Sequence, residues 1–178
     1  MMGLERREIR RLRELHGAEG RSAQRSFLAE GRRLIDDLVV RGWAPRLLVV
    51  RDDLEVPAAW DAAVVCRCDG ATAARISQAS TPSGYLAEFA LPAPAVHDPR
   101  AGGLILVGVH DPGNLGTLLR SAAAFGLPQV LLLGGADPFG AKAVQASAGA
   151  LAVVRLVRGE GVESLAQLDG GAPLLGLV

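Results

Sequence analysis

The sequence has few aromatic residues and few cysteines. Aromatics make up 4% of its 178 residues, and the only cysteines are Cys66 and Cys68. With so few rings, aliphatic side chains must build most of the core. The two cysteines stand two residues apart in a predicted strand, so their side chains point to the same face and are poorly placed to bridge each other. Two thiols do not hold a structural zinc without further ligands, and the three histidines (16, 97 and 110) show no metal-ligand spacing with them. We therefore expect reduced cysteines and no metal site.

Long apolar runs are also missing. No segment approaches the roughly 20 uninterrupted apolar residues of a membrane span, and the arginine- and glutamate-rich N-terminus is unlike a secretory signal. The G-x-G-x-x-G and P-loop patterns are absent, so the pair Gly134-Gly135 gives little support to a nucleotide-binding α/β protein. With 49% hydrophobic and 21% charged residues, the composition is that of a folded globular protein. We expect it in the cytoplasm, with no membrane partner.

Positive charge is not in overall excess, because 19 basic residues balance 19 acidic ones. This balance argues against a protein that coats nucleic acid indiscriminately. The charge is unevenly distributed, however: residues 1–25 carry seven arginines and four glutamates, whereas the rest of the chain carries 12 basic and 15 acidic residues. A basic arm on a neutral body favours an anionic partner. A solvated helix of mixed charge explains the same residues equally well at this point.

Strands and helices alternate in the first half of the sequence. Helices are predicted over residues 5–16, 32–41 and 72–78, and strands over residues 27–31, 46–50, 64–68 and 84–90. Three prolines fall within residues 91–99, which predicts a stiff, extended connector. We therefore predict a first domain over residues 1–90, a linker over 91–102 and a second domain over 103–178.

The second domain repeats a strand–helix pattern. Strands are predicted over residues 104–109, 130–133, 153–157 and 174–178, with helices over 114–125 and 139–147 and a short one near 162–168. Strands rich in leucine and valine, each followed by a helix, are typical of a parallel sheet with helices on both faces. The predicted fold class is therefore α/β. Because the sequence stops on a predicted core strand, we expect this domain to be cut short.

One segment, residues 109–126, combines a strand end, a tight turn and a helix. Pro112 and Gly113 make the turn, Asn114 is the predicted N-cap, and Gly126 ends the helix. At helical spacing, four apolar residues face the sheet and four others face away from it: Leu115, Leu118, Leu119 and Ala122 on the first side, and Gly116, Arg120, Ala123 and Ala124 on the second. We expect Arg120 to project from a floor of small residues that lets RNA or a second subunit approach it closely.

This arrangement suits an anionic ligand. The free N–H groups and the positive dipole end of the helix at Asn114 favour an anion. Arg120, further along the helix, adds a forked donor for a phosphate or ribose oxygen. An ordinary solvated arginine is the alternative interpretation of Arg120.

The residues from Asp111 to Gly126, Asp-Pro-Gly-Asn-Leu-Gly-Thr-x-x-Arg-Ser-Ala-x-x-Phe-Gly, resemble the first motif of the SpoU (TrmH) family in the SPOUT superfamily of RNA methyltransferases. Three further segments agree with this resemblance. Residues 27–34 and 80–87 are similar to the family's N-terminal substrate-binding domain, and residues 142–150 are similar to the second helix of its catalytic domain. The resemblance extends from about Arg25 to Val178.

The resemblance implies a fold and an activity. The fold is a small α/β RNA-binding domain followed by a parallel-sheet SPOUT-type (α/β knot) domain. The activity is transfer of a methyl group from S-adenosylmethionine to a ribose 2′-hydroxyl, in ribosomal RNA more than in transfer RNA. Family members are homodimers in which the first-motif arginine lies near the subunit interface.

By the same resemblance, Asn114 and Arg120 are catalytic residues of the first motif, and Ser147 joins them from the second helix. An arginine guanidinium stays protonated at physiological pH. We therefore expect Arg120 to grip a phosphate and stabilise negative charge on the ribose oxygen rather than to act as a base.

The sequence departs from the family after the first motif. The family's Glu-Gly and Ser-Leu-Asn motifs form the knotted cofactor pocket and follow the strand on which this sequence stops, whereas Gly159-Glu160-Gly161 precedes that strand and is interpreted as a turn. Leu175, Gly176 and Leu177 would border the cofactor in a complete family member. We therefore expect these 178 residues to be truncated before the knot, not to hold S-adenosylmethionine, and to be inactive alone.

RNA contacts of the first domain are predicted at Arg25, Arg32 and Arg33, with solvated arginines as the alternative. The competing functional hypothesis is a non-catalytic RNA-binding module that keeps the first domain. Methyl transfer from a labelled cofactor to RNA distinguishes the two hypotheses.

Overall fold

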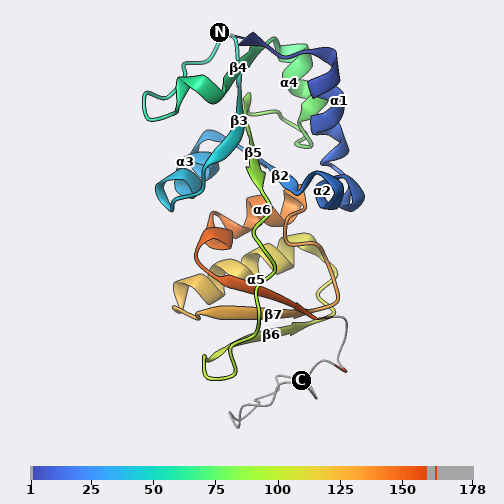
Figure 1. The fold of residues 1–178 in the computed structure, drawn as a ribbon, viewed down its shortest axis with the longest axis vertical. Coiled ribbons are helices and arrows are strands. Elements are labelled where there is room, and N and C mark those ends of the chain that lie inside the picture. The colour runs from blue at the N-terminus through green and yellow to red at the C-terminus, as the bar shows by residue number, and fades with distance from the viewer. Residues whose placement is uncertain (1, 160–162, 164–178) are drawn as a thin grey trace.

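Two β-sheets organise the computed structural model, which describes residues 2–159 and 163. A five-stranded sheet lies in the first half of the chain and a three-stranded sheet in the second. Helices α5 (Pro112–Ala124) and α6 (Ala141–Ser147) lie between the two sheets (Figure 1). Helices α5 and α6 therefore face the second sheet on one side and the first half of the chain on the other.

The first sheet has the strand order β1-β4-β3-β5-β2. Its strands are β1 (Met2–Gly3), β2 (Ser26–Glu30), β3 (Pro45–Arg51), β4 (Val65–Cys68) and β5 (Tyr85–Ala90). Strand β3 pairs in parallel with β4 and antiparallel with β5. A mixed sheet of this kind allows both crossover and return connections.

Helices cover both faces of this sheet. Because alternate residues of a strand point to opposite faces, Leu48 and Val50 of β3 pack in one cluster with α3 (Arg32–Val40). Leu47 and Val49 pack on the other face with α1 (Arg6–Glu14) and α4 (Gly70–Ile76). The short helix α2 (Ala18–Gln24) follows α1 and leads into β2.

The second sheet is parallel throughout. It consists of β6 (Gly103–Val107), β7 (Gln129–Leu133) and β8 (Arg155–Gly159), with β7 in the centre. Every residue of β7 is buried, as expected for a central parallel strand. Val130 and Leu132 pack with α5 and α6, and on the other face Leu131 and Leu133 pack beside Ala95 of the linker. The predicted α/β class with a parallel sheet is confirmed.

The predicted elements up to residue 157 are all present, with small shifts at their ends. Two short elements were not predicted, β1 and α2, and residues 62–64 and 150–152 form single 3₁₀ turns. Cys66 and Cys68 are free and buried, as predicted, and burial raises the pKa of Cys68 to about 11. The helix predicted near 162–168 and the strand predicted over 174–178 lie outside the described residues.

A buried arginine joins the two halves of the chain. Arg21 of α2 is 6% exposed, and its Nε and Nη2 donate to Asp137 Oδ2 at 2.9 and 2.7 Å. Asp137 lies between β7 and α6, and Arg158 of β8 also donates to its carboxylate. Beside this contact, the rings of Phe27 and Phe139 pack with their centroids 5.2 Å apart. Charge pairing and apolar packing thus both fix the second sheet against the first.

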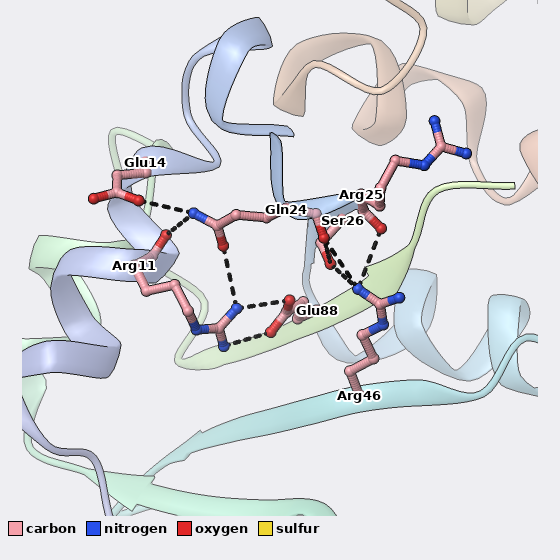
Figure 2. A network of polar contacts seen from close by, with 7 residues as sticks. All are labelled: Arg11, Glu14, Gln24, Arg25, Ser26, Arg46 and Glu88. Carbon is pink, nitrogen blue, oxygen red and sulfur yellow. Dashed lines mark hydrogen bonds and ion pairs between the residues drawn. The ribbon is translucent and has the colours of Figure 1, made fainter. Parts of the chain in front are cut away.

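A second polar network fixes α1 and α2 at the edge of the first sheet (Figure 2). Arg11 of α1 donates from Nη1 and Nη2 to the carboxylate of Glu88 on β5, at 2.8 and 2.7 Å. Burial raises the pKa of the Glu88 carboxyl, but the hydrogen bonds and charge of Arg11, together with Ser26 and the charge of Arg46, outweigh burial, so the pKa lies below its usual value. Arg46 donates to the main-chain carbonyl of Arg25, which has a left-handed φ of 49°. The network therefore stabilises the strained turn between α2 and β2.

Within the described part of the chain, every helix is too short or too polar to cross a membrane. Among those same residues, histidine, cysteine, aspartate and glutamate side chains do not gather in threes that could hold a metal ion.

Candidate functional site

Helix α5 begins at Pro112, two residues before the predicted start at residue 114. Its N-cap is Asp111, whose Oδ1 accepts a hydrogen bond from the Asn114 N–H at 2.7 Å, and Pro112 is the first helical residue. The prediction of Asn114 as N-cap is therefore wrong. Proline has no N–H and a fixed φ, so it is favoured at the first position of a helix, and the residue before it becomes the cap. Asn114 lies in the first turn with its side chain exposed.

Lys142 of α6 holds this turn from the neighbouring helix. Its Nζ lies 2.9 Å from Asp111 Oδ2. The hydrogen bond from Lys142, followed by the one from the Asn114 N–H, holds the pKa of the Asp111 carboxyl below its usual value. Lys142 is the only lysine in the sequence, and its side chain is 66% exposed. The start of α5 is thus capped by a carboxylate that is itself paired with a cation.

Gly116 lies in the contact between α5 and α6, not on the open face where the helical spacing was expected to place it. A Cβ added there would lie 2.5 Å from the Ala143 carbonyl oxygen and 2.6 Å from Ala146 Cβ. The expected orientation is wrong because α6 covers a second flank of α5, which the helical spacing of apolar residues does not reveal. Glycine at 116 permits the close approach of the two helices.

Arg120 lies on the exposed face of α5. Thr117, Ser121 and Ala124 are exposed on the same helix, and Phe125, at the helix end, is 84% exposed. The ion pairs among the described residues use other arginines, at positions 11, 21, 32, 51 and 158. The guanidinium of Arg120 is therefore not committed to an ion pair with any described residue.

Ser147 ends α6 and is fully buried. Its Oγ donates to the Val144 carbonyl oxygen at 2.8 Å, within the same helix. Its main-chain nitrogen lies 2.9 Å from the place of a Cβ on Gly116. Ser147 is thus adjacent to α5 through its backbone, and its hydroxyl does not face the exposed side of α5 that carries Arg120.

A cleft of about 620 Å³ lies between the two halves of the chain. One wall comes from the start of α5 and from α6, through Gly113, Lys142 and Gln145. The other wall comes from the first domain, through Glu30 and Gly31 at the end of β2 and through the loop that precedes β5. The four segments that resemble the SpoU family in the sequence therefore meet around one cleft.

Glu30 shapes the first-domain wall of this cleft. Its Oε2 accepts a hydrogen bond from Ser77 Oγ at 2.7 Å, and its Oε1 accepts one from the Ser83 N–H at 2.9 Å. Both partners belong to the loop between α4 and β5. Glu30 was not predicted as a site residue, nor was Lys142; a single lysine in an arginine-rich sequence was the available signal for the latter.

The three arginines predicted to contact RNA do not lie together. Arg32 and Arg33 are exposed at the start of α3, directly after Gly31 of the cleft, and Arg32 Nε lies 3.5 Å from Asp36 Oδ2. Arg25 borders a different pocket, of about 610 Å³, beside the linker, and its Nη2 donates to the Pro92 carbonyl oxygen at 3.2 Å. The predicted cofactor residues Leu175, Gly176 and Leu177 lie outside the described residues.

Comparisons with known proteins match both halves of the chain. Residues 103–175 match the SpoU rRNA methylase family model, and residues 6–87 match the MRM3-like substrate binding domain model. The chain is 28% identical over 153 residues to the 23S rRNA (guanosine(2553)-2′-O)-methyltransferase of Bacillus subtilis. The aligned residues cover 85% of this chain and 61% of that protein. It is 30% identical over 157 residues to an uncharacterized tRNA/rRNA methyltransferase of Synechocystis, covering 79% of this chain and 55% of that protein.

The fold is similar to that of solved rRNA methyltransferase structures. The rRNA methyltransferase of Sinorhizobium meliloti superimposes with a TM-score of 0.80 at 28% identity, covering 97% of this chain and 69% of that one. An AdoMet-bound structure of an rRNA methyltransferase from the same organism gives a TM-score of 0.78, with 96% of this chain and 68% of that one covered. The chain spans little more than half the length of the two curated bacterial relatives. It belongs to the SpoU (TrmH) family, with a SpoU rRNA methylase domain behind an MRM3-like substrate-binding domain.

Proposed function

We propose that the protein is an RNA methyltransferase that transfers a methyl group from S-adenosylmethionine to a ribose 2′-hydroxyl of ribosomal RNA. The observation that carries this proposal is the cleft between the two halves of the chain, where the start of α5 faces the Glu30 wall of the substrate-binding domain. An RNA strand in this cleft contacts both domains at once. Ribosomal RNA is favoured over transfer RNA because the B. subtilis relative is named for 23S rRNA.

RNA binding in the cleft rests on fixed positive groups. Lys142 is exposed on one wall and offers a cation to a phosphate, although its Nζ also pairs with Asp111 Oδ2. Arg32 and Arg33 lie beside the opposite wall and are exposed. We assign phosphate contacts to these two arginines, and we assign Arg25, beside the linker, a contact with RNA outside the cleft.

Arg120 supplies the electrostatic part of the proposed chemistry. As the 2′-hydroxyl loses its proton to solvent, negative charge develops on its oxygen, and a guanidinium stabilises that charge without changing its own protonation. Asn114, exposed in the first turn of α5, orients the ribose. Ser147 is a positioning residue, because its backbone lies against Gly116 and fixes α6 beside α5.

S-Adenosylmethionine supplies the methyl group when bound. Leu175, Gly176 and Leu177, which are proposed to border the cofactor, are not among the described residues. The described residues bind RNA, orient the ribose and stabilise charge.

The proposed assembly is a homodimer in the cytoplasm. The exposed face of α5 carries Arg120 and ends in the 84% exposed Phe125, which suits a face covered by a second copy of the chain. The proposed division of the chain is a substrate-binding domain over residues 1–90, a linker over 91–102 and a methyltransferase domain over 103–178. This division agrees with the positions of the two sheets.

The test is methyl transfer by the protein expressed from its complete gene. The protein is incubated with labelled S-adenosylmethionine and protein-free ribosomal RNA, and the product is hydrolysed with alkali, which does not cleave beside a 2′-O-methylated ribose. Label in alkali-resistant dinucleotides is the expected result. RNA binding without any methyl transfer would instead support a non-catalytic RNA-binding module.

A further inference from the structure

A basic depression lies on the outer side of the first domain, at the end of the molecule away from the second sheet. Helices α1 and α4 lie side by side there (Figure 1). The depression has a volume of about 630 Å³ and is lined by three arginines of α1 and one of α4: Arg6, Arg10, Arg13 and Arg75. All four are exposed.

These four arginines have no structural partner among the described residues, whereas other arginines do. Arg11, on the same helix α1, turns toward the sheet and pairs with Glu88 through two hydrogen bonds (Figure 2). Arg46 is likewise occupied, with main-chain carbonyls and Ser26. The chain therefore separates arginines that stabilise the fold from arginines that face an open depression.

The arginine side chains that line the depression repel one another in the free protein. Arg6, Arg10 and Arg13 follow one another at spacings of four and three residues, so they lie on one helix face, where like charges destabilise a helix. The acidic residue in the lining is Glu14, whose Oε2 already accepts a hydrogen bond from Gln24 at 2.9 Å. Opposite charges at these spacings would stabilise a solvated helix, whereas three arginines do not. A partner with several negative charges relieves the repulsion instead.

The depression adjoins the cleft through the end of α4. Arg75 lines the depression, and the next residue, Ile76, lines the cleft. His16, also in the depression, lies with its Nε2 2.7 Å from the Ile76 carbonyl oxygen. An RNA strand that leaves the cleft at Ile76 therefore reaches the arginines of α1. These arginines extend over about 10 Å of helix.

We propose that this depression is a second RNA site, which grips the phosphate backbone of a segment adjoining the one in the cleft. The inference rests on the proposed function, because RNA is the polyanion that the cleft is proposed to hold. Guanidinium groups pair with phosphates through forked hydrogen bonds and read no base sequence. The site therefore adds affinity and orientation but does not choose the nucleotide.

The experiment compares two triple variants with the same net charge. Arg6, Arg10 and Arg13 are replaced by glutamine in one, and the exposed Arg7, Arg41 and Arg100 are replaced by glutamine in the other. Glutamine matches arginine closely in helix propensity, so α1 is preserved. The probe is a fluorescein-labelled RNA hairpin with a single-stranded loop, and its affinity is measured by anisotropy over a series of KCl concentrations.

The first triple variant is expected to bind the hairpin roughly tenfold more weakly and to lower the slope of log K against log salt by about two to three. The second triple variant is expected to change that slope by less than about one. An equal slope change in both variants, or no binding of the hairpin by the native chain, would overturn the inference. Circular dichroism checks folding, and if the first triple variant unfolds, the pair Arg13→Gln and Arg75→Gln repeats the test from two helices.

The outcome is separable from that of the proposed function. A slope change confined to the first triple variant, with no methylation of ribosomal RNA by the complete protein, would support the second RNA site. The same result would contradict the proposed methyltransferase activity. Methyl transfer with an unaltered slope in the first variant would keep the enzyme and reject the second RNA site.

Discussion

At the scale of single residues, Arg120 decides whether the proposed chemistry is correct. Arg120→Ala removes a charge that acts mainly on the developing oxyanion, so we expect turnover to fall roughly 10²- to 10³-fold. The dissociation constant for RNA should change much less, because Lys142, Arg32 and Arg33 remain. Single-turnover methyl transfer and RNA anisotropy measure the two effects.

The matched variant at this position is Arg120→Lys, which keeps the charge and loses the planar fork. Partial recovery of turnover by lysine would identify charge as the main contribution. Loss of affinity in proportion to turnover in Arg120→Ala would reduce Arg120 to a binding residue.

Gly116 shows how one absent side chain fixes the site. The added Cβ of Gly116→Ala would meet the main chain of α6, at Ala143 and Ser147, and main chain cannot rotate aside. Overpacking of this kind destabilises by about 1–3 kcal/mol, so we expect a loss of that order in urea denaturation. Gly102→Ala is the control, because a Cβ there meets nothing within 4 Å. Equal stability of the two variants would mean that the α5–α6 contact relaxes freely.

At the scale of elements, the contact of α2 with the β7–α6 loop sets a pH dependence. Burial raises the pKa of the Asp137 carboxyl, but hydrogen bonds from the Phe139 N–H and Arg21, with the charges of Arg21 and Arg158, outweigh it, so the pKa lies below its usual value. A carboxyl whose pKa is lower in the folded than in the unfolded state stabilises the fold above the unfolded value of roughly 4. That stabilisation is lost as the pH falls through the folded pKa.

We therefore expect Asp137→Asn to unfold at a lower temperature than the native chain at pH 7. The loss is about 3 kcal/mol, because Arg21 is left buried without a counter-charge. The difference between the two proteins should shrink as the pH falls below about 4, and thermal unfolding followed by circular dichroism at several pH values measures it. Asp53→Asn, which alters an exposed pair with Arg51, serves as the control. A difference that stays constant down to acid pH would contradict this account.

Elements with their own apolar pattern could be predicted from the sequence, and elements that depend on distant partners could not. Strand β1 is two residues long and exists through parallel pairing with β4, which is remote in the sequence. Helix α2 is flanked by glycine and is held by the Arg21 contacts. The start of α5 was misplaced because Asn114 and Asp111 are both good caps, and the proline at 112 decides between them.

At the scale of the whole molecule, the cleft could be anticipated only in part. The sequence identified the segments that line it, since residues 27–34, 80–87, 109–126 and 142–150 were singled out. Their convergence depends on how the two sheets are fixed together. That geometry comes from Arg21 with Asp137 and from the packing of Phe27 on Phe139, which join residues far apart in the sequence. No local pattern contains this information.

The exposed end of α5 permits a test of assembly. Phe125 is 84% exposed beside the face that carries Arg120, and a large apolar side chain in that position gains free energy when another surface covers it. In a two-fold dimer the same patch meets itself, so a single substitution acts twice in the interface. We therefore expect Phe125→Ser to shift the complete protein from dimer toward monomer in sedimentation velocity at micromolar concentration.

The control for this shift is Val40→Ser on α3, which removes a side chain of similar exposure, 86%, from a different surface. Only the Phe125 variant should dissociate. If Arg120 requires the second subunit to be oriented, dissociation and loss of methyl transfer should follow the same dependence on protein concentration. A monomeric native protein that methylates RNA would reject the dimer while leaving the role of Arg120 intact.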